Sequence, residues 1–555
     1  MLFMKLPNEI IYHIFDFLKS SDILQSFSHL NHRYDNLIQS YIKYLDLTNG
    51  WNGNQQDLQW ISKTIQKLKI NQLNFYIKDN YQFPQLQSLY LDNIFVYGDW
   101  ISKMNLKSLT LWSNEIPSCY AADITIPETV VRFSTNLPID LNLLHTNLID
   151  LNIKITSVID LIKIVQKIPL VQRLSITFYQ DYRMEDDDIH DYEAMIDKLE
   201  PLNELKFFSL STSYDKWSKN NIGLPFNKIA FFIDNYCSNK NILKTVSLQL
   251  YFIKFNEELW STIERYKNTY NHFNFYGIFI IETEIIEKVQ KLSKNTNFAY
   301  HIETTQICNT IYIHIYSLPF YFDKFYGFTS CSELNPNVSF SSVRHLYLTE
   351  TCGTYKISFE SLAKRMSNLI SINCNINIEH DYNTTEQIII VDKDIFYHVR
   401  SLHFTMRCNR KTCPCRKVLC HLLNQMPYLE YLNTSEFEFL SGNYSLPPIK
   451  ELIQGDCDVQ LVNLLIKRLP YLTTLSIGYV RTNPDHMSEI VGPFFINLPL
   501  FKSISFPYGG GWCGNDTTPY GKYIQEALKL IQNMNNSLSN VQLDWKNGKA
   551  MFYRQ

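Results

Sequence analysis

Five residues with metal-binding side chains lie close together in the segment RCNRKTCPCRKVLCH. They are Cys408, Cys413, Cys415, Cys420 and His421. Thiolates and an imidazole are ligands that zinc prefers, so this cluster could hold a structural zinc ion. The spacing does not match that of familiar zinc knuckles, and no second pair of ligands follows. We therefore predict a basic loop followed by one core-facing cysteine, with no bound metal.

Two other segments contain residues that could do chemistry. The run MEDDDIHDYE, Met184–Glu193, gathers carboxylates around His190 and could attract a cation or a basic peptide. It lacks the alternation and the glycine of a calcium loop, so a solvated loop is the better interpretation. The segment PYGGGWCGN, Pro507–Asn515, is rich in glycine but lacks the lysine and hydroxyl residue of a phosphate-binding loop. We interpret it as a loop that carries Trp512.

The sequence contains none of the motifs that announce an enzyme. We find no nucleophile elbow, no metalloprotease helix and no dinucleotide fingerprint. A catalytic triad assembled in space from scattered residues would leave no such motif. On the motifs, we predict that the chain is not an enzyme and uses no cofactor.

The composition indicates an ordinary globular protein rather than a nucleic-acid or membrane protein. The 555 residues are 45% apolar and 19% charged, and the formal net charge is −3. This charge gives no basic field for nucleic acid or for an anionic membrane. No apolar run reaches membrane-spanning length, and the first residues lack the apolar centre of a signal peptide. The twelve cysteines are scattered, which suits a reducing compartment, and we expect a cytoplasmic or nuclear protein.

A short phrase of three apolar residues recurs along most of the chain. Two variable residues and then one separate its apolar positions, as in Leu106, Leu109 and Leu111. The interval is irregular, at roughly 20 to 30 residues, which is the range of leucine-rich repeats. Each copy predicts a short strand. The copies begin at Ile42, Ile70, Leu86, Leu106, Leu148, Val171, Leu205, Leu243, Val343, Leu369, Val399, Leu472, Phe501 and Leu538.

Amphipathic helix patterns that end at a proline lie between these phrases. The clearest are Val158–Ile168, Leu419–Met426, Leu461–Leu469 and Ile490–Leu498. Helix, proline turn, short strand and loop form the unit of a β/α solenoid, whose repeats stack into one core. The region resembles divergent leucine-rich repeats, and Leu106–Asn114 comes nearest to the full pattern. We predict that residues 42–555 form an irregular solenoid, in which residues 252–342 fit either further repeats or an insertion.

The variable residue between the last two apolar positions should point away from the core. Because strand side chains alternate, these residues should align on the exposed face of the sheet, which is the usual binding surface of stacked repeats. The set is aromatic and rich in hydroxyl groups, and suits a target peptide with apolar anchors. It comprises Tyr90, Thr110, Ser175, Asn274, Tyr347, His403, Ser476 and Ser505, with Trp112 and Tyr276 one alternation further along and Trp512 at one end.

The first residues of the chain predict three short helices. Pro7 suits the start of a helix, and the apolar residues that follow form two stripes. Ser20 and Ser21 can cap a second helix, and Asn31 can cap a third. About thirty residues in three helices cannot bury enough surface to be stable alone. Some of their apolar side chains must therefore cover a partner or the rest of this chain.

This segment resembles the F-box. The matching residues are Leu6-Pro7, Glu9-Ile10, Ile14-Phe15, Leu18, Asp22-Ile23-Leu24, Leu30-Asn31 and Arg33-Tyr34, with Tyr34 where the family usually has tryptophan. The resemblance implies an F-box in residues 1–41 that docks on a Skp-type adaptor and so joins a cullin. It also implies that the adaptor contacts are Leu6, Pro7, Glu9, Ile10, Ile14, Phe15, Leu18, Ile23, Leu24, Leu30 and Tyr34.

The sequence therefore predicts an α/β protein, a short all-helical module followed by a leucine-rich-repeat solenoid. The resemblance implies a substrate-recruiting subunit of a ubiquitin ligase, in which the solenoid binds a target protein of unknown identity. Two alternatives stay open. The helices could serve only as a cap on the solenoid, and the protein could be an interaction scaffold that acts outside any ligase.

Overall fold

The computed structural model divides the chain into two compact units, Met1–Phe279 and Ile280–Gln555. Each unit is described by itself. The described residues are 5–48, 55–71, 83–92, 99–112, 125–137, 139–178, 200–212, 226–237, 242–254, 257–281, 298–305, 310–328, 339–349, 365–378, 396–408, 417–435, 438–440, 445–456, 459–479, 484–507, 519–534, 538–546 and 549–554.

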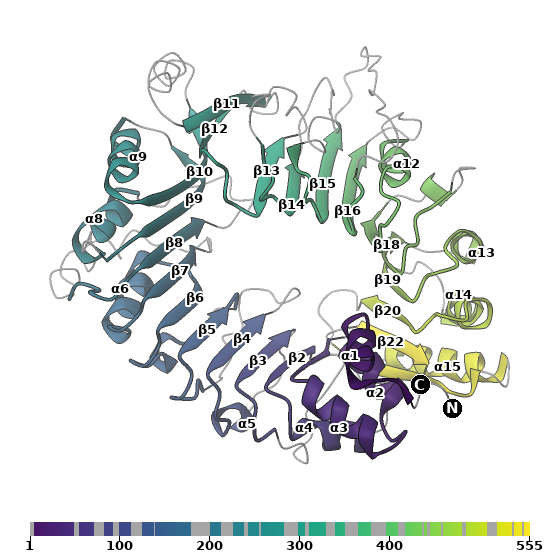
Figure 1. Ribbon diagram of the computed structural model, residues 1–555. Coiled ribbons are helices and arrows are strands. Elements are labelled where there is room, and N and C mark those ends of the chain that lie inside the picture. The colour runs from purple at the N-terminus through teal and green to yellow at the C-terminus, as the bar shows by residue number, and fades with distance from the viewer. Residues whose placement is uncertain are drawn as a thin grey trace, which may run out of the picture. The chain divides into compact units, whose positions relative to one another are not determined.

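The first unit begins with three helices and continues as a run of strands that follow chain order (Figure 1). The helices are α1 (Asn8–Asp16), α2 (Ser20–Phe27) and α3 (His32–Tyr41). Strands β1 to β9 form one parallel ladder, in which each strand from β1 to β8 pairs with the next in sequence. The strands are β1 (Tyr44–Leu47), β2 (Lys67–Asn71), β3 (Ser88–Asp92), β4 (Ser108–Trp112), β5 (Arg132–Thr135), β6 (Asp150–Ile155), β7 (Arg173–Phe178), β8 (Phe207–Thr212), β9 (Thr245–Lys254) and β10 (His272–Ile281).

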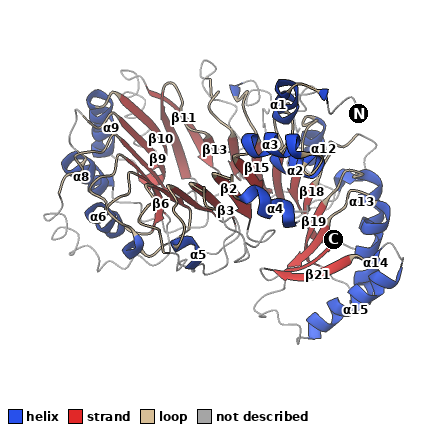
Figure 2. Cartoon of the chain, turned by 60° about the horizontal axis from the view of Figure 1, so that its bottom comes forward, coloured by secondary structure: helices blue, strands red, loops and turns tan. Residues whose placement is uncertain are grey.

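Helical segments connect these strands and cover one face of the sheet (Figure 2). Ser157 starts α6 with a capping box, in which its hydroxyl accepts from the Asp160 N–H and the Asp160 carboxylate accepts from the Ser157 N–H. The segments are α4 (Gln55–Ser62), α5 (Asp99–Ser102), the 3-10 turn η2 (Leu141–Leu143), α6 (Val158–Lys167), α8 (Phe226–Tyr236) and α9 (Glu257–Thr269).

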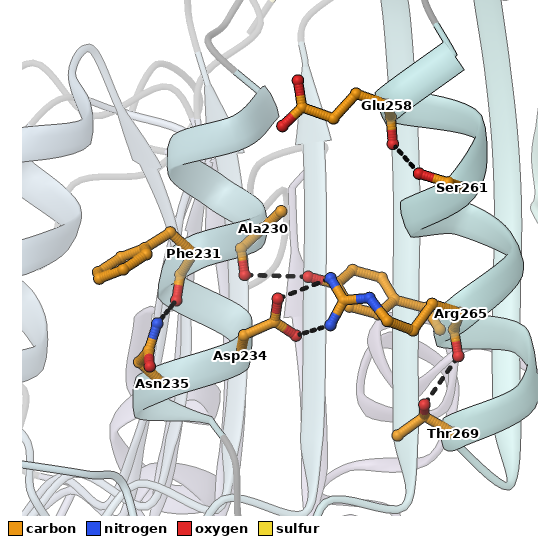
Figure 3. A network of polar contacts seen from close by, with 9 residues as sticks. Ala230, Phe231, Asp234, Asn235, Glu258, Ser261, Arg265 and Thr269 are labelled. Atoms are coloured by element: carbon orange, nitrogen blue, oxygen red, sulfur yellow. Dashed lines mark hydrogen bonds and ion pairs between the residues drawn. The ribbon is translucent and has the colours of Figure 1, made fainter.

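The two longest helices of this unit in the described part of the chain, α8 and α9, are joined by side-chain contacts. Figure 3 shows Arg265 on α9 reaching Asp234 on α8, with two N–H···O contacts of 2.8 and 2.7 Å. The Tyr266 hydroxyl donates to the Ala230 carbonyl at 3.0 Å. The ion pair and the hydrogen bond both join neighbouring helices, so they hold adjacent repeats in register.

The second unit contains a hairpin and a second sheet. Strands β11 (Phe298–Thr305) and β12 (Thr310–Ser317) pair antiparallel. Strands β13 to β20 pair in parallel in chain order, and β22 and β21 close the sheet antiparallel. The strands are β13 (Lys324–Phe328), β14 (His345–Thr349), β15 (Ser371–Ile378), β16 (Ser401–Cys408), β17 (Tyr431–Thr434), β18 (Glu451–Asp456), β19 (Thr474–Tyr479), β20 (Ser503–Pro507), β21 (Val541–Lys546) and β22 (Lys549–Arg554).

Helices lie beside the later strands of this unit (Figure 2). They are α12 (Lys417–Asn424), the 3-10 turn η7 (Glu438–Leu440), α13 (Val459–Arg468), α14 (Pro484–Asn497) and α15 (Pro519–Met534). None of the helices in the described part of the chain has the length and apolar character that a bilayer crossing requires.

The predicted fold class is confirmed: N-terminal helices precede long parallel sheets of leucine-rich-repeat type with helices between the strands. The residues at most predicted strand phrases are buried, for example Leu106, Leu109 and Leu111. Leu73 and Phe75 lie outside the described residues, and Leu543 is half-buried. Four helices form where helix patterns precede a proline, although α14 begins at Pro484, before the predicted Ile490. Within the segment of unclear register, residues 252–342, the structure shows the end of β9, α9, β10, the β11–β12 hairpin and β13.

Two local predictions are wrong. The strand predicted from Ile70 is β2, which begins at Lys67 and buries Leu68 and Ile70, so the predicted register is displaced. Neither Ser20 nor Ser21 caps α2, whose N-cap is Lys19 without a side-chain hydrogen bond. The Ser20 hydroxyl instead donates to the Tyr44 carbonyl at 2.9 Å, because it faces the first strand.

Three of the strands that the apolar phrase did not predict share one reason. Strands β5, β17 and β18 each carry a polar residue at the third core position of the phrase. Thr135, Thr434 and Gln454 occupy these positions and are all buried, at 3%, 2% and 1% exposure. A pattern that requires three apolar residues therefore cannot detect these repeats.

Candidate functional site

The helical module, defined as α1 to α3, is built around one aromatic cluster. The Phe15 ring packs edge-on against Phe27 at 5.3 Å and against Tyr41 at 5.3 Å between centroids. Tyr34 stacks on Phe27 with centroids 6.1 Å apart. The Tyr41 hydroxyl donates to Asp16 at 2.6 Å, and burial together with this bond raises the pKa of Tyr41 to about 12. These contacts use one stripe of α1 and leave the other stripe out of the core.

Polar contacts fix the ends of the module's helices. The predicted cap at Asn31 is confirmed, since its side chain accepts from the backbone N–H groups of Arg33 at 2.9 Å and Tyr34 at 3.1 Å. The Arg33 guanidinium also donates to Asn8 and to the Leu6 carbonyl at the start of α1. The start of α1 is therefore held against α3.

The module is attached to the first repeat on one side. Ser20 bonds to the first strand, as described above, and the His29 ring bonds to Asp57 on α4. His29 has a φ of 61°, and its backbone N–H donates to Asp35 at 2.9 Å, which supports this uncommon conformation. The module thus caps the beginning of the solenoid, as one of the two interpretations of its sequence expects.

The module also exposes large apolar side chains. Phe17 is 88% exposed and Ile10 is 44% exposed, and Leu18 and Leu30 are exposed as well. An exposed phenylalanine beside further apolar side chains is typical of a surface that binds a partner. The cap interpretation alone does not account for this surface.

The residues implied as adaptor contacts fall into three groups by burial. Phe15, Ile23, Leu24 and Tyr34 are buried in the module's own core and present no surface to a partner. Leu6 and Ile14 are half-buried, and the exposed members are Pro7, Glu9, Ile10, Leu18 and Leu30.

Phe17 was not among the implied contacts but is the most exposed large apolar residue of the module. It is the C-cap residue of α1 and continues the stripe of Ile10 and Ile14.

One face of the first unit's sheet carries a row of residues in register, most of them half-buried, with Asn152 exposed and Ser247 buried. Lys69 lies 3.8 Å from the Asp46 carboxylate, and its ammonium group lies 5.0 Å from the centroid of the Tyr90 ring. Burial raises the pKa of Tyr90, with smaller contributions from Asp92 and Asp46. The first residues of the row, on β1 and β2, are charged, and most of the later residues carry hydroxyl groups. It runs Asp46, Lys69, Tyr90, Thr110, Ser134, Asn152, Ser175, Ser209 and Ser247.

The corresponding row of the second unit is aromatic and amide-rich. Tyr326 and Tyr347 stack with centroids 4.7 Å apart and an interplanar angle of 14°. Flat rings beside amide and imidazole groups can stack on a ligand and hydrogen-bond to it. The row runs Tyr326, Tyr347, Asn373, His403, Asn433, Ile453, Ser476, Ser505 and Met551.

Two histidines on this face are held neutral by their surroundings. His345 Nδ1 lies 2.7 Å from the Ser371 hydroxyl, and His403 Nε2 lies 3.2 Å from the Thr405 hydroxyl. Burial lowers the pKa of both imidazoles below their ordinary value. Burial also raises the pKa of Tyr347, with Asp323 contributing. His345, His403 and Tyr347 therefore offer neutral hydrogen-bonding groups on this face near pH 7.

Most residues predicted on the sheet's face lie there, with two exceptions. Tyr276 follows Asn274 on the same side of β10 but is fully buried and packs edge-on against Tyr251 at 5.8 Å. Trp512 lies outside the described residues. Trp112 is half-buried at the end of β4. Tyr326 and Lys69 were missed, the first in the segment of unclear register and the second because the predicted register of β2 was displaced.

The predicted chemical clusters fall largely outside the described residues. Met184–Glu193, Cys413 and Cys415 lie there, as does the glycine-rich loop after Pro507. Within the described residues no group of three or more potential ligands could hold a metal ion. Cys420, predicted as a core-facing cysteine, is a free thiol on α12 that is only half-buried.

No protein-family model matches the sequence, and no curated protein matches it. Among solved structures, one similar chain is CroV588, described as a novel circular LRR protein structure. The match has 15% sequence identity and a TM-score of 0.24, and it covers 83% of this chain and 59% of CroV588. At this similarity nothing about the function of CroV588 transfers to the present chain.

Proposed function

We propose that this protein recruits a target protein to a ubiquitin ligase and performs no chemistry itself. The helical module docks on a Skp-type adaptor, which joins a cullin, and the solenoid holds the target. A leucine-rich-repeat solenoid is typical of protein-interaction scaffolds. The adaptor is proposed from the F-box resemblance of the first residues.

One observation carries the docking part of the proposal. The stripe of α1 that contains Ile10 and Phe17 is exposed, although the same helix buries Phe15 completely. Exposing a large apolar side chain forgoes roughly 1.5–3 kcal/mol of burial free energy, which a partner can recover by covering it. The module is already anchored to the first repeat through Ser20 and His29, so this stripe is free for another protein.

The target would bind the exposed face of the sheet. Holding a target close to the ligating enzymes raises its effective concentration, so no catalytic group is needed on this chain. The neutral cluster of Tyr347, Asn373 and His403, with Tyr326 buried beside Tyr347, offers stacking and hydrogen bonds rather than a charge field. It suits a segment of target protein better than a polyanion.

Capture of a purified Skp-type adaptor tests the proposal. We expect the wild type to bind the adaptor and the double variant Ile10→Asp, Phe17→Asp to lose at least about tenfold in affinity, as expected for central interface residues. Leu464→Asp is the matched control, because Leu464 is also an exposed apolar residue on a helix. Tyr347→Ala should likewise leave adaptor binding unchanged.

Full binding by the double variant would refute docking through α1. If the wild type does not bind the adaptor at all, the ligase assignment fails. The exposed stripe would then support the second candidate, an interaction scaffold outside any ligase.

A further inference from the structure

Five consecutive repeats of the second unit carry an apolar side chain in the turn that precedes the strand, and in four of them this side chain is exposed. Tyr397, Tyr428, Tyr471 and Leu500 are between 44% and 56% exposed. Pro448 occupies the turn before β18 and is half-buried. We call these five residues the turn ridge. They belong to the repeats of β16, β17, β18, β19 and β20.

Backbone hydrogen bonds place these turns directly beside one another. The N–H of Glu430 donates to the Arg400 carbonyl at 2.9 Å, and the N–H of Lys450 donates to the Glu430 carbonyl at 2.8 Å. In the same way, the N–H of Thr473 donates to the Lys450 carbonyl at 2.8 Å, and the N–H of Lys502 donates to the Thr473 carbonyl at 2.7 Å. Neighbouring strands lie about 4.8 Å apart, so the turn ridge spans roughly 19 Å, the length of about six extended residues.

The side chains of the turn ridge also touch. The rings of Tyr397 and Tyr428 have centroids 5.5 Å apart. The Arg400 guanidinium lies 4.9 Å from the Tyr428 centroid and donates to the Tyr428 carbonyl at 3.0 Å. This packing holds the tyrosine rings in place, so little rotamer entropy remains to be lost on binding.

The surroundings of the turn ridge are positively charged. Lys450 pairs with Glu430 at 2.9 Å, whereas no carboxylate pairs with Arg400 or Lys502 in the described part of the chain. At the far end the Arg554 guanidinium reaches the Pro499 carbonyl at 3.5 Å. The cations along the ridge are Arg400, Lys450, Lys502 and Arg554, and the carboxylates are Glu430 and Glu451.

The equivalent turns elsewhere in the chain are mostly polar. In the first unit the large exposed apolar residues among the described turns before β3 to β8 are Ile149 and Leu170, at 38% and 51% exposure. The residue directly before the first apolar position of the phrase is Gln85, Asn105, Thr129, Asn147 and Glu204 in the other repeats of that unit. In the second unit it is Ser342 before β14 and Asn368 before β15, whereas Tyr321 before β13 is 61% exposed. Before β16 this position is His398, and Tyr397 lies one residue earlier. Single exposed apolar residues are ordinary, but a row of them in adjacent turns is typical of a binding surface.

We propose that the turn ridge binds an extended acidic segment of a partner protein, with apolar side chains at alternate positions. Tyrosine and leucine anchors at strand spacing suit an extended chain, and the unpaired cations complement acidic residues between its anchors. The ridge residues lie in the turns before the strands and are distinct from those on the exposed face of the second unit's sheet.

An immobilised library of octapeptides, probed with the purified full-length chain, tests this inference. We expect bound peptides to be enriched in Asp and Glu and in large apolar residues at alternate positions. Tyr428→Ser with Tyr471→Ser should reduce binding roughly tenfold, as for interface anchors. Arg400→Gln with Lys502→Gln should remove the acidic preference, and the preference of the wild type should weaken in high salt.

Leu170→Ser is the matched control, since it alters an exposed turn of the first unit and should change nothing. The inference is overturned if the wild type selects no acidic residues, for example if it selects proline-rich peptides regardless of charge. It is also overturned if the acidic preference survives the tyrosine double variant. Hydrogen-exchange protection of β16 to β20, measured on the same variants, shows whether the second unit is folded and is independent of peptide binding.

Discussion

The two units contain the same kind of parallel strand ladder, in two separate sheets. They differ in the residues at the third buried position of each strand phrase, which form a row across the sheet. In the first unit this row is apolar except for Thr135, and in the second it is interrupted by Cys374, Thr434 and Gln454. The first row is Leu47, Ile70, Leu91, Leu111, Thr135, Ile153, Ile176, Leu210 and Leu248. The second is Leu348, Cys374, Phe404, Thr434, Gln454, Ile477 and Phe506.

The polar residues in these rows are not equivalent. The Thr135 hydroxyl accepts from the Leu137 N–H at 2.9 Å, so this residue is satisfied. Gln454 is 1% exposed, and neither its Oε1 nor its Nε2 has a hydrogen-bond partner in the described structure. Burying an amide without partners costs about 1–3 kcal/mol. The comparison teaches that the backbone ladder maintains a repeat even where its side chain opposes burial.

The largest effect should come from placing such a polar residue in the apolar row. Leu111→Gln removes a fully buried leucine and introduces an amide without a partner, because its neighbours in register are the apolar Leu91 and Thr135, whose hydroxyl is already bonded to Leu137. We expect the first unit to lose about 3–5 kcal/mol of unfolding free energy. Hydrogen exchange of β3 to β5 measures the loss. Unchanged protection there would show that the first unit tolerates polar residues as the second does.

The reverse change should give a smaller effect of opposite sign. Gln454→Leu replaces an unsatisfied amide by an apolar side chain of similar size beside Ile477, so the second unit should gain about 1–2 kcal/mol. Thr135→Val is the matched control. It deprives the Leu137 N–H of its acceptor and should cost about 1 kcal/mol. Urea unfolding followed with hydrogen exchange measures the change in unfolding free energy for each variant. Changes of the same sign would contradict the distinction between the unsatisfied Gln454 and the satisfied Thr135.

The same rows explain how much of the fold the sequence could reveal. Where all three positions are apolar, as at Leu106, the phrase located the strand correctly. It failed at Thr135, Thr434 and Gln454, because burial there depends on neighbouring strands that a single stretch of sequence does not contain. The register of β2 failed for a related reason, since Ile70 belongs to two overlapping apolar patterns, one of which begins at Ile65.

The candidate surfaces were predictable in part. Alternation along a strand was sufficient to place Tyr90, Tyr347 and His403 on the exposed face. It could not show that Tyr276, on the same alternation, is covered by packing against Tyr251. Likewise, helical spacing separated two stripes on α1, but only the packed module shows that the stripe with Phe17 is the exposed one.

The smallest predicted effect concerns pH and again separates the two units. Burial lowers the pKa of His345 and His403, both in the second unit. The unfolded chain then binds a proton near the ordinary value of about 6.5, at a pH where the folded imidazoles stay neutral. The unfolding free energy of the second unit should therefore fall slightly as the pH drops from about 7.5 to about 6.

Other groups with shifted pKa values act outside this window or with the opposite sign. The pKa of Glu451 is raised by burial, so its protonation would stabilise the second unit, but chiefly near its ordinary value of about 4.5. The pKa of Asp46 is lowered, so the first unit loses its contribution only below about 4. Hydrogen-exchange protection of β14 to β16, corrected for intrinsic rates, should thus decrease between the two pH values, while protection of β1 to β3 should not. His345→Gln with His403→Gln should abolish the difference, since glutamine keeps a hydrogen-bonding side chain without a titratable proton. A difference that persists in this variant would mean that the histidines are not its source.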